Sequence, residues 1–213
     1  ALPISLTSAQ LKSLSSDQVA ALTSAQLNAL TSAQLPSLSS AQVRALSTDQ
    51  VSKLTTTQIV GLSTAQVAAL STGQVASLTS VQINAMASDD LKALTTTQVR
   101  ALTSDQLSKL SSDQIALMAT DDIAAISTAQ ISHLSTAAIA ALTTAQAKAL
   151  TTASINALTS AQVAAIETAD LAVLSTAQLN KLGTAQLAQL TSVQVTALTS
   201  AQQIGRASCR ERV

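Results

Sequence analysis

Large apolar residues recur along this chain at alternating spacings of five and three residues, as at Leu22, Leu27, Leu30 and Leu35. In a β-strand, odd spacings would send these side chains alternately to opposite faces. In one continuous α-helix, eight residues advance by about 800°, so the apolar stripe would drift by roughly 80° per repeat. The pattern therefore predicts a chain that changes direction once every eight residues.

The repeating unit is an octad with the pattern L-[ST]-[ST]-x-Q-[LVI]-x-x. It occurs 24 times in succession from Leu6 to Ala197, without an insertion or deletion, and a truncated unit starts at Leu198. Position five is Gln in 19 octads, and position six is Leu, Val or Ile in all but one, where it is Ala147. Such regularity is typical of repeat proteins, in which each unit packs against others of its kind. Position one is Leu in 20 octads, and the exceptions are Met86, Met118, Ile126 and Ile166.

Each octad carries the signature of a helix N-terminus. In the octad that starts at Leu22, Thr23 stands at an N-cap position and Gln26 follows three residues later, which is the pattern of a capping box. Leu22 and Leu27 occupy the two positions of a hydrophobic staple around the same cap. We therefore expect one short helix per octad, beginning directly after position two.

The charged residues support this interpretation independently. Within the octads, every acidic residue lies at position two, four or five, and every basic residue lies at position seven or eight. A helix dipole favours acids in the first turn and bases in the last. The acids are Asp17, Asp49, Asp89, Asp90, Asp105, Asp113, Asp121, Asp122, Glu167 and Asp170; the bases are Lys12, Arg44, Lys53, Lys92, Arg100, Lys109, Lys148 and Lys181.

Four octads lack the hydroxyl at position two. Three of them also replace the position-five Gln by Asp, which occurs there nowhere else. Either a carboxylate in the first turn offsets the lost cap, or the cap moves one residue along, onto Ser88, Thr120 or Thr168. The three pairs are Ala87 with Asp90, Ala119 with Asp122 and Glu167 with Asp170; the fourth octad has Gly183, itself an acceptable N-cap.

A helix of about six residues is far below the ~12–15 residues at which isolated helices become marginally stable, so the octads must share a core. The predicted fold is all-α: a solenoid or superhelix of short capped mini-helices, one per octad. Positions one and six should lie inside, positions three and seven should face water, and the frequent Ala at position eight should allow close approach. Pro36, at position seven, predicts that the helix of its octad is ending there. The number of mini-helices per turn stays open, because the similarity of Ser5–Val19 to Ser37–Val51 indicates either a turn of four octads or a duplication, which we favour.

The composition argues against several classes of function. Charged residues make up 10% of the chain and balance to zero, so nothing indicates binding to nucleic acid, and no apolar run approaches the ~18 residues of a membrane span. His133 is the only histidine, and no glycine pattern of a nucleophile elbow accompanies any serine. The Asp89–Asp90 and Asp121–Asp122 pairs could bind a cation if they stacked, but no calcium-loop motif is present and capping explains them. We therefore expect no catalytic residue, no metal ligand, no cofactor and no enzymatic activity.

Two resemblances refine the boundaries. Octads such as LSTAQVAA (62–69) and LTSAQVAA (158–165) resemble the LTTAQVAA-type octapeptide arrays of very large bacterial surface or secreted proteins that are described as adhesin-like, and the match covers 6–202. The resemblance implies an extracellular or cell-surface location and a structural use. Residues 203–213 (QIGRASCRERV) resemble an in-frame translation of a common sequencing adapter, so we expect a non-native tail on a metagenomic fragment; residues 1–5 are a partial leading repeat. Without the tail the chain has ten acidic and eight basic residues and no cysteine, because Cys209 lies in the tail.

Three functions remain as hypotheses. The first is a spacer or stalk within a large surface protein, because the regularity of the array outweighs any single site. The second is a scaffold that binds a protein or surface ligand through the solenoid exterior. It requires a recurring patch of unusual residues, whereas positions three and seven carry mostly Ser, Thr, Ala and Asn. The third is an ordered array of hydroxyls that binds ice or another repetitive surface.

Overall fold

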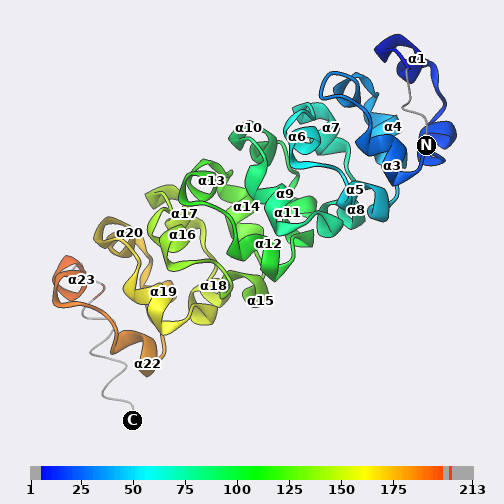
Figure 1. The fold of residues 1–213 in the computed structure, drawn as a ribbon. Helices are drawn as coiled ribbons and strands as arrows, with labels where there is room; N and C mark the ends of the chain where they lie inside the picture. The colour runs from blue at the N-terminus through cyan, green and yellow to red at the C-terminus, as the bar shows by residue number, and fades with distance from the viewer. Residues whose placement is uncertain (1–5, 199–201, 203–213) are drawn as a thin grey trace. The chain divides into compact units, whose positions relative to one another are not determined.

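The computed structural model describes residues 6–198 and Gln202, and every regular element in this part of the chain is helical (Figure 1). The described residues form 23 α-helices and one 3₁₀ helix and no strand, so the predicted all-α fold of mini-helices is confirmed. The chain divides into two compact units, Ala1–Gln106 and Leu107–Val213. No helix among the described residues is long and apolar enough to cross a membrane.

The helices of the first unit have three to six residues each, and each belongs to one octad. They are α1 (Ser8–Ser13), α2 (Ser16–Ala20), α3 (Ser24–Asn28), the 3₁₀ helix η1 (Leu35–Ser37), α4 (Ser40–Ala45), α5 (Thr48–Ser52), α6 (Thr56–Val60), α7 (Thr64–Ala69), α8 (Thr72–Ser77), α9 (Ser80–Ala85), α10 (Ser88–Lys92) and α11 (Thr96–Ala101). Helix α12 (Ser104–Ser108) includes the boundary.

The second unit repeats the arrangement with helices of four to six residues. They are α13 (Ser112–Leu117), α14 (Thr120–Ala125), α15 (Thr128–Ile131), α16 (Thr136–Ala140), α17 (Thr144–Ala149), α18 (Thr152–Ala157), α19 (Ser160–Ala164), α20 (Thr168–Val173), α21 (Thr176–Leu179), α22 (Thr184–Leu187) and α23 (Ser192–Ala197).

Two extended residues separate consecutive mini-helices and change the direction of the chain. After α4, Leu46 has φ −62° and ψ 141°, and Ser47, the N-cap of α5, has φ −69° and ψ 160°. The N–H of Leu46 donates to the Val43 carbonyl at 3.2 Å, which closes the end of α4. No described residue has a positive φ, so the chain turns once per octad without needing glycine.

Within each unit, a mini-helix packs against the helix of the octad three further along the chain. In the first unit α4 contacts α7 and α5 contacts α8; in the second, α14 contacts α17, which contacts α20. The stacking period is therefore three octads. The similarity of Ser5–Val19 to Ser37–Val51 pairs octads that lie four apart, α1 with α4 and α2 with α5, whereas the stacked helices lie three octads apart, as α2 and α4 do; this agrees with duplication as the origin of the similarity.

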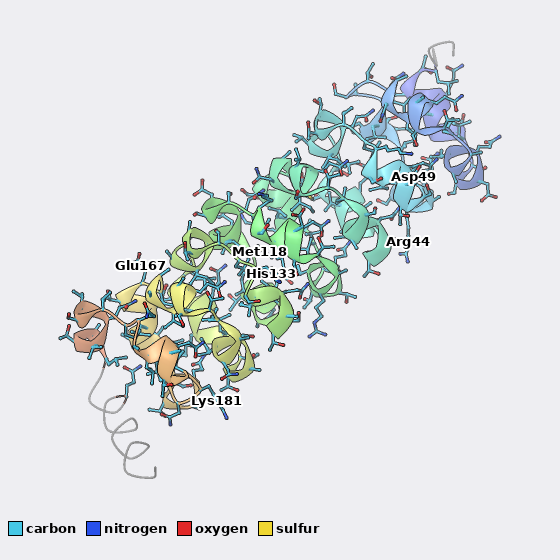
Figure 2. All side chains as sticks on the ribbon, turned by 60° about the horizontal axis from the view of Figure 1, so that its bottom comes forward. Arg44, Asp49, Met118, His133, Glu167 and Lys181 are labelled. Carbon is cyan, nitrogen blue, oxygen red and sulfur yellow. The ribbon has the colours of Figure 1, made fainter. Side chains whose placement is uncertain are left out.

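The core consists of the large apolar residues at positions one and six. From Leu30 to Leu182, every residue at these two positions is at most 7% exposed. The predicted inside of the solenoid is therefore confirmed, and position seven is exposed or half-exposed throughout this range. Figure 2 shows the side chains on the ribbon, and its labelled charged residues Arg44, Asp49, Glu167 and Lys181 are all exposed.

The octad that contains Pro36 departs from the expected mini-helix. Its residues 32–34 form a turn, and Pro36 lies within η1, so this octad has no α-helix that could end at the proline. The physical reason is that proline has no N–H to donate to the carbonyl four residues earlier. In a helix of only five or six residues, losing one such bond is enough to leave the tighter 3₁₀ form.

Candidate functional site

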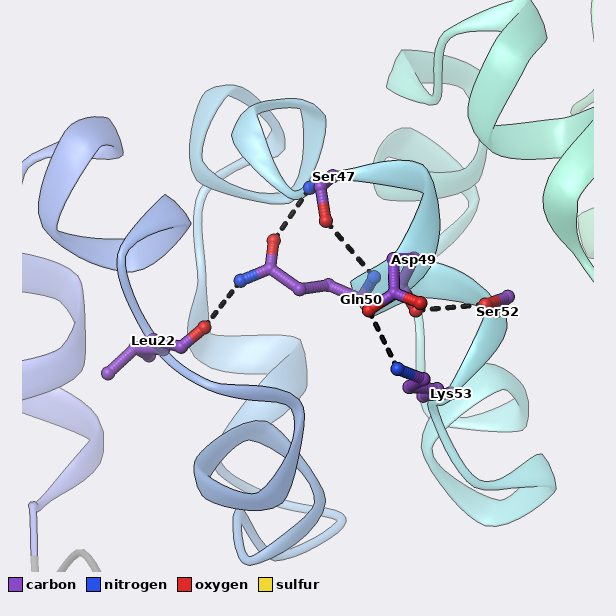
Figure 3. A network of polar contacts seen from close by, with 6 residues as sticks. All are labelled: Leu22, Ser47, Asp49, Gln50, Ser52 and Lys53. Carbon is purple, nitrogen blue, oxygen red and sulfur yellow. Dashed lines mark hydrogen bonds and ion pairs between the residues drawn. The ribbon is translucent and has the colours of Figure 1, made fainter.

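The polar side chain with the most contacts in this fold is the glutamine at position five, and Gln50 is representative. Its Oε1 accepts from the backbone N–H of Ser47 at 2.6 Å, while the Ser47 Oγ accepts from the N–H of Gln50 at 3.1 Å (Figure 3). These two bonds are the reciprocal capping box that the sequence predicts. The same box begins most of the mini-helices; its second bond is 3.2 Å long at Thr159 and Gln162, for example.

The other half of the amide reaches the preceding turn of the solenoid. The Nε2 of Gln50 donates to the carbonyl of Ala20, 30 residues earlier, at 2.9 Å. It also donates to the carbonyl of Leu22, 28 residues earlier (Figure 3). In the second unit, Nε2 of Gln162 donates to the carbonyls of Ile131 at 2.9 Å and Leu134 at 2.8 Å. One buried amide therefore caps its own helix and bonds to the turn below it.

We call the set of these turn-to-turn bonds the glutamine ladder. Its acceptors are carbonyls at the C-terminal end of one mini-helix and at position one of the following octad. Carbonyls at a helix C-terminus lack partners within their helix, so the ladder satisfies groups that would otherwise be buried without a donor. Its members include Gln34, Gln42, Gln50, Gln58, Gln66, Gln74, Gln82, Gln98, Gln106, Gln146, Gln162, Gln178, Gln186, Gln194 and Gln202.

The capping argument from sequence missed this second role. A signal for it was present, because a capping box accepts Glu as readily as Gln at its third residue, yet Glu occurs at position five of no octad. The exclusion of Glu indicates that the side chain needs a donor as well as an acceptor.

The octads with Asp at position five have no side-chain cap. Their helices α10, α14 and α20 begin with Ala87, Ala119 and Glu167 as N-caps, and none of these makes a side-chain cap bond. The alternative that the cap moves one residue along is therefore wrong, because the backbone bonds of the first turn already fix the start of each helix. The Asp90 N–H, for example, donates to the Ala87 carbonyl at 3.0 Å.

The carboxyl groups of these octads are buried where the amide would be. Burial, and next the negative charge of Asp89, raise the pKa of Asp90; burial, and next the charge of Glu167, raise the pKa of Asp170. Each Asp pair considered as a cation site is split, since Asp89 and Asp121 are exposed while Asp90 and Asp122 are buried.

The octad with Gly183 keeps half of the capping box. The Gln186 Oε1 accepts from the Gly183 N–H at 2.6 Å, but glycine has no side chain to return the second bond. Gln186 still donates to the Leu158 carbonyl of the preceding turn, so its rung of the ladder is intact.

Other singled-out residues lie on the surface or outside the described residues. His133 is exposed and follows α15, and Cys209 lies in the part of the chain that the structure does not describe (Figure 2). Among the described residues, no three His, Cys, Asp or Glu side chains lie together as a metal site would require. The ion pairs Lys53–Asp49 (2.8 Å) and Lys92–Asp89 (3.4 Å) are both exposed and within single octads.

A shallow depression in the second unit lies between two stacked helices. It is lined by Thr152, Ala153 and Asn156 of α18 and by Lys181, which follows α21. These four side chains offer no nucleophile paired with a base, and the two hydrogen-bonding groups besides the lysine are a hydroxyl and an amide. This surface contributes no chemistry comparable to the repeated amide.

Replacing Thr159 by alanine should lower the free energy of unfolding by about 1 kcal/mol, because the Gln162 N–H loses its acceptor while the rest of the rung remains. Chemical unfolding followed by circular dichroism measures this loss. Thr159→Ser, which keeps the hydroxyl, is the matched control and should retain most of the stability. Equal losses in both variants would contradict a role for the hydroxyl.

Comparison with known proteins identifies the repeat. A family model described as the ALTTAQ repeat matches six times, at residues 5–32, 24–56, 52–80, 83–120, 115–152 and 163–200. A comparison with curated proteins found no match. The matches cover residues 5–200 apart from 81–82 and 153–162, and the predicted resemblance to octapeptide arrays is confirmed: the chain belongs to the ALTTAQ repeat family.

Proposed function

We propose that this chain is a spacer or stalk segment within a large, adhesin-like bacterial surface or secreted protein. The observation that carries the proposal is the glutamine ladder. The position-five amide, present in 19 of the 24 octads, is buried from Gln42 onward and bonded inside the solenoid, as Gln162 is to Ile131 and Leu134. This shared amide serves the array itself rather than a ligand.

The stacking rule supports the same role. Within each unit, a mini-helix packs against the helices of the octads three before and three after it, so further octads extend a unit without requiring a new kind of contact. A structure that grows by repetition suits a segment whose length matters more than any one residue. The absence of cysteine from 6–202 is compatible with export of such a segment.

The exposed positions favour a spacer over a binding scaffold. A scaffold would repeat distinctive side chains at the stacking period of three octads. Instead, the exposed valine Val60 lies at position seven, while Val81 and Val193 lie at position four in octads that are 14 apart, which is not a multiple of three; most other exposed residues are Ser, Thr, Ala or Asn. The position-two hydroxyls, which a hydroxyl array would present, accept bonds from backbone N–H groups of their own helices, as at Ser47.

A display experiment tests the proposal. Arrays of 12, 24 and 48 octads are placed between a bacterial surface anchor and a terminal epitope, and the distance of the epitope from the membrane is measured by fluorescence localisation of bound antibody fragments. We expect the distance to grow with the number of octads. A matched set in which the exposed Arg44, Lys92, Arg100 and Lys148 are replaced by serine should give the same distances.

Two outcomes would contradict the spacer. A distance that does not change with octad number would remove the role of length. Specific adhesion of cells that is lost in the serine set, at unchanged epitope distance, would favour the binding scaffold instead.

A further inference from the structure

The glutamine ladder is interrupted where aspartate replaces the amide. Asp90 and Asp170 are 6% and 4% exposed, so each is buried as deeply as the glutamines that it replaces. Among the described residues, no hydrogen bond reaches either carboxylate, whereas the amides Gln98 and Gln162 in the following and preceding octads each join two turns. In this part of the chain, every side-chain nitrogen or oxygen that is fully enclosed has a hydrogen-bond partner. Because the two carboxyls have no such partner, they keep a narrow contact with solvent, through which a proton can reach them.

The group that each aspartate would meet follows from the register of the ladder. The rungs on either side of Asp90 join Gln82 to the Leu54 carbonyl at 2.6 Å and Gln98 to the Leu70 carbonyl at 2.7 Å, always 28 residues back. At Asp90 the same step leads to the Leu62 carbonyl. No donor bonds to that carbonyl within the described residues.

Asp170 repeats this situation in the second unit. Its flanking rungs join Gln162 to the Leu134 carbonyl at 2.8 Å and Gln178 to the Leu150 carbonyl at 2.7 Å. The same step leads to the Leu142 carbonyl, which also has no donor among the described residues. An ionised carboxylate opposite a carbonyl offers two acceptors and no proton, and burying such a pair is unfavourable.

We propose that Asp90 and Asp170 are proton-binding rungs, at which uptake of one proton by the carboxyl supplies the missing donor to the carbonyl of Leu62 or Leu142, respectively, and closes the ladder. The neutral carboxyl then acts as the glutamine Nε2 does elsewhere in the array. Its side chain is one methylene shorter than that of glutamine, so the closed rung requires a small approach of the two turns. The proton stays on the carboxyl, which donates it in the hydrogen bond to the carbonyl.

Burial, and next the neighbouring acid, favour the neutral form of each carboxyl. Asp90 has Asp89 and Lys92 on its own helix, and α7, which packs against α10 within the first unit, carries no titratable residue. Asp170 has Glu167 in its own octad; of the helices packed against α20, α17 carries the exposed Lys148 and α23 carries no charge. Burial and the adjacent acid raise the pKa of both carboxyls.

The sign of the pH effect follows from this direction. A carboxyl whose pKa is higher in the folded state than in the unfolded state stabilises the fold when it is protonated. The stabilisation is complete below the ordinary aspartate pKa of 3.8 and is lost as the pH rises through the raised value. The two aspartate rungs should therefore be closed in acid and open at neutral pH.

The test compares the full chain with the double variant Asp90→Asn and Asp170→Asn, in which an amide restores a donor at every pH. Thermal midpoints are measured from about pH 3.5 to 8 at constant ionic strength with a chelator present. We expect the thermal midpoint of the variant minus that of the parent to increase with pH by about 2–4 °C per rung. The reason is that only the parent loses its donor when the carboxyl ionises. Carbon NMR of labelled aspartate should show the two carboxyls titrating above the ordinary range.

Controls separate this proposal from general effects of aspartate. Asp113→Asn, at an exposed position four, removes a first-turn carboxylate without touching the ladder, and its relative midpoint should show no such rise. A relative midpoint of the double variant that does not change with pH would overturn the proposal. So would a parent whose neutral-pH midpoint rises in sodium or calcium, but not in the double variant, because a cation rather than a proton would then neutralise the rung.

Discussion

Replacing Gln162 by glutamate should lower the free energy of unfolding by about 3 kcal/mol at neutral pH. The substitution keeps the side-chain length and the acceptor for the Thr159 N–H, which Oε1 now receives at 2.8 Å. It removes the donor to the carbonyls of Ile131 and Leu134 and sets a second acceptor, with a negative charge, against them. Because the Gln162 side chain is only 2% exposed, water cannot compensate for the change.

The chain contains a matched control in Gln18. Its capping box has the same geometry, with the Ser15 N–H donating to Oε1 at 2.8 Å and the Gln18 N–H donating to Ser15 Oγ at 3.1 Å. Gln18 is exposed, and its Nε2 makes no bond within the described residues. Gln18→Glu should therefore change the stability by less than about 0.5 kcal/mol, as surface substitutions usually do.

Urea unfolding of both variants, followed by circular dichroism, measures the difference directly. Hydrogen exchange locates the destabilised region of the chain. Backbone amides of α15 and α19 should lose protection in Gln162→Glu, because that rung joins their octads. Equal, small losses in both variants would mean that the ladder contributes little. The glutamine would then matter for capping alone.

The local part of this fold could be predicted from the sequence because its causes lie within one octad. The staple residues Leu22 and Leu27, the cap Thr23 and the amide Gln26 all belong to a single octad, and as two pairs they predict the start of a helix. The burial of positions one and six follows from the same pattern, since a mini-helix has only one apolar side.

The ladder could not be derived in this way, because it depends on the number of octads in a turn. The partner of Gln162 lies 28 residues away, and nothing within its octad specifies that distance. The stacking of octads three apart decides which carbonyls meet the amide, and that number emerges from packing of the side chains rather than from a motif. The burial of the aspartates escapes a local argument for the same reason: such an argument sees Asp90 only as a carboxylate in the first turn of its helix, and the packing of other octads buries it.

Truncation of the core should have an effect similar in size to the loss of a rung. Leu171→Ala, at position six of α20, is expected to lower the free energy of unfolding by about 2–5 kcal/mol, the range for a leucine removed from a closed core. Leu171 is 0% exposed, and α20 packs against α17 on one side and α23 on the other. In α17, position six is already Ala147, so the variant would place two small residues in adjacent layers and leave little with which to fill the cavity.

Leu187→Ala is the matched control, because Leu187 holds position six of α22 but is only half-buried. Its loss should be less than half of that for Leu171, since part of the side chain is already in water. Urea unfolding of the two variants gives the ratio. If the two losses in the free energy of unfolding were nearly equal, the octads would bury their leucines independently, without packing against the neighbouring turns. In a shared core, the stability lost on truncating a leucine depends strongly on whether both neighbouring turns cover that leucine. Packing against both turns is also the reason that such a short helix is stable here.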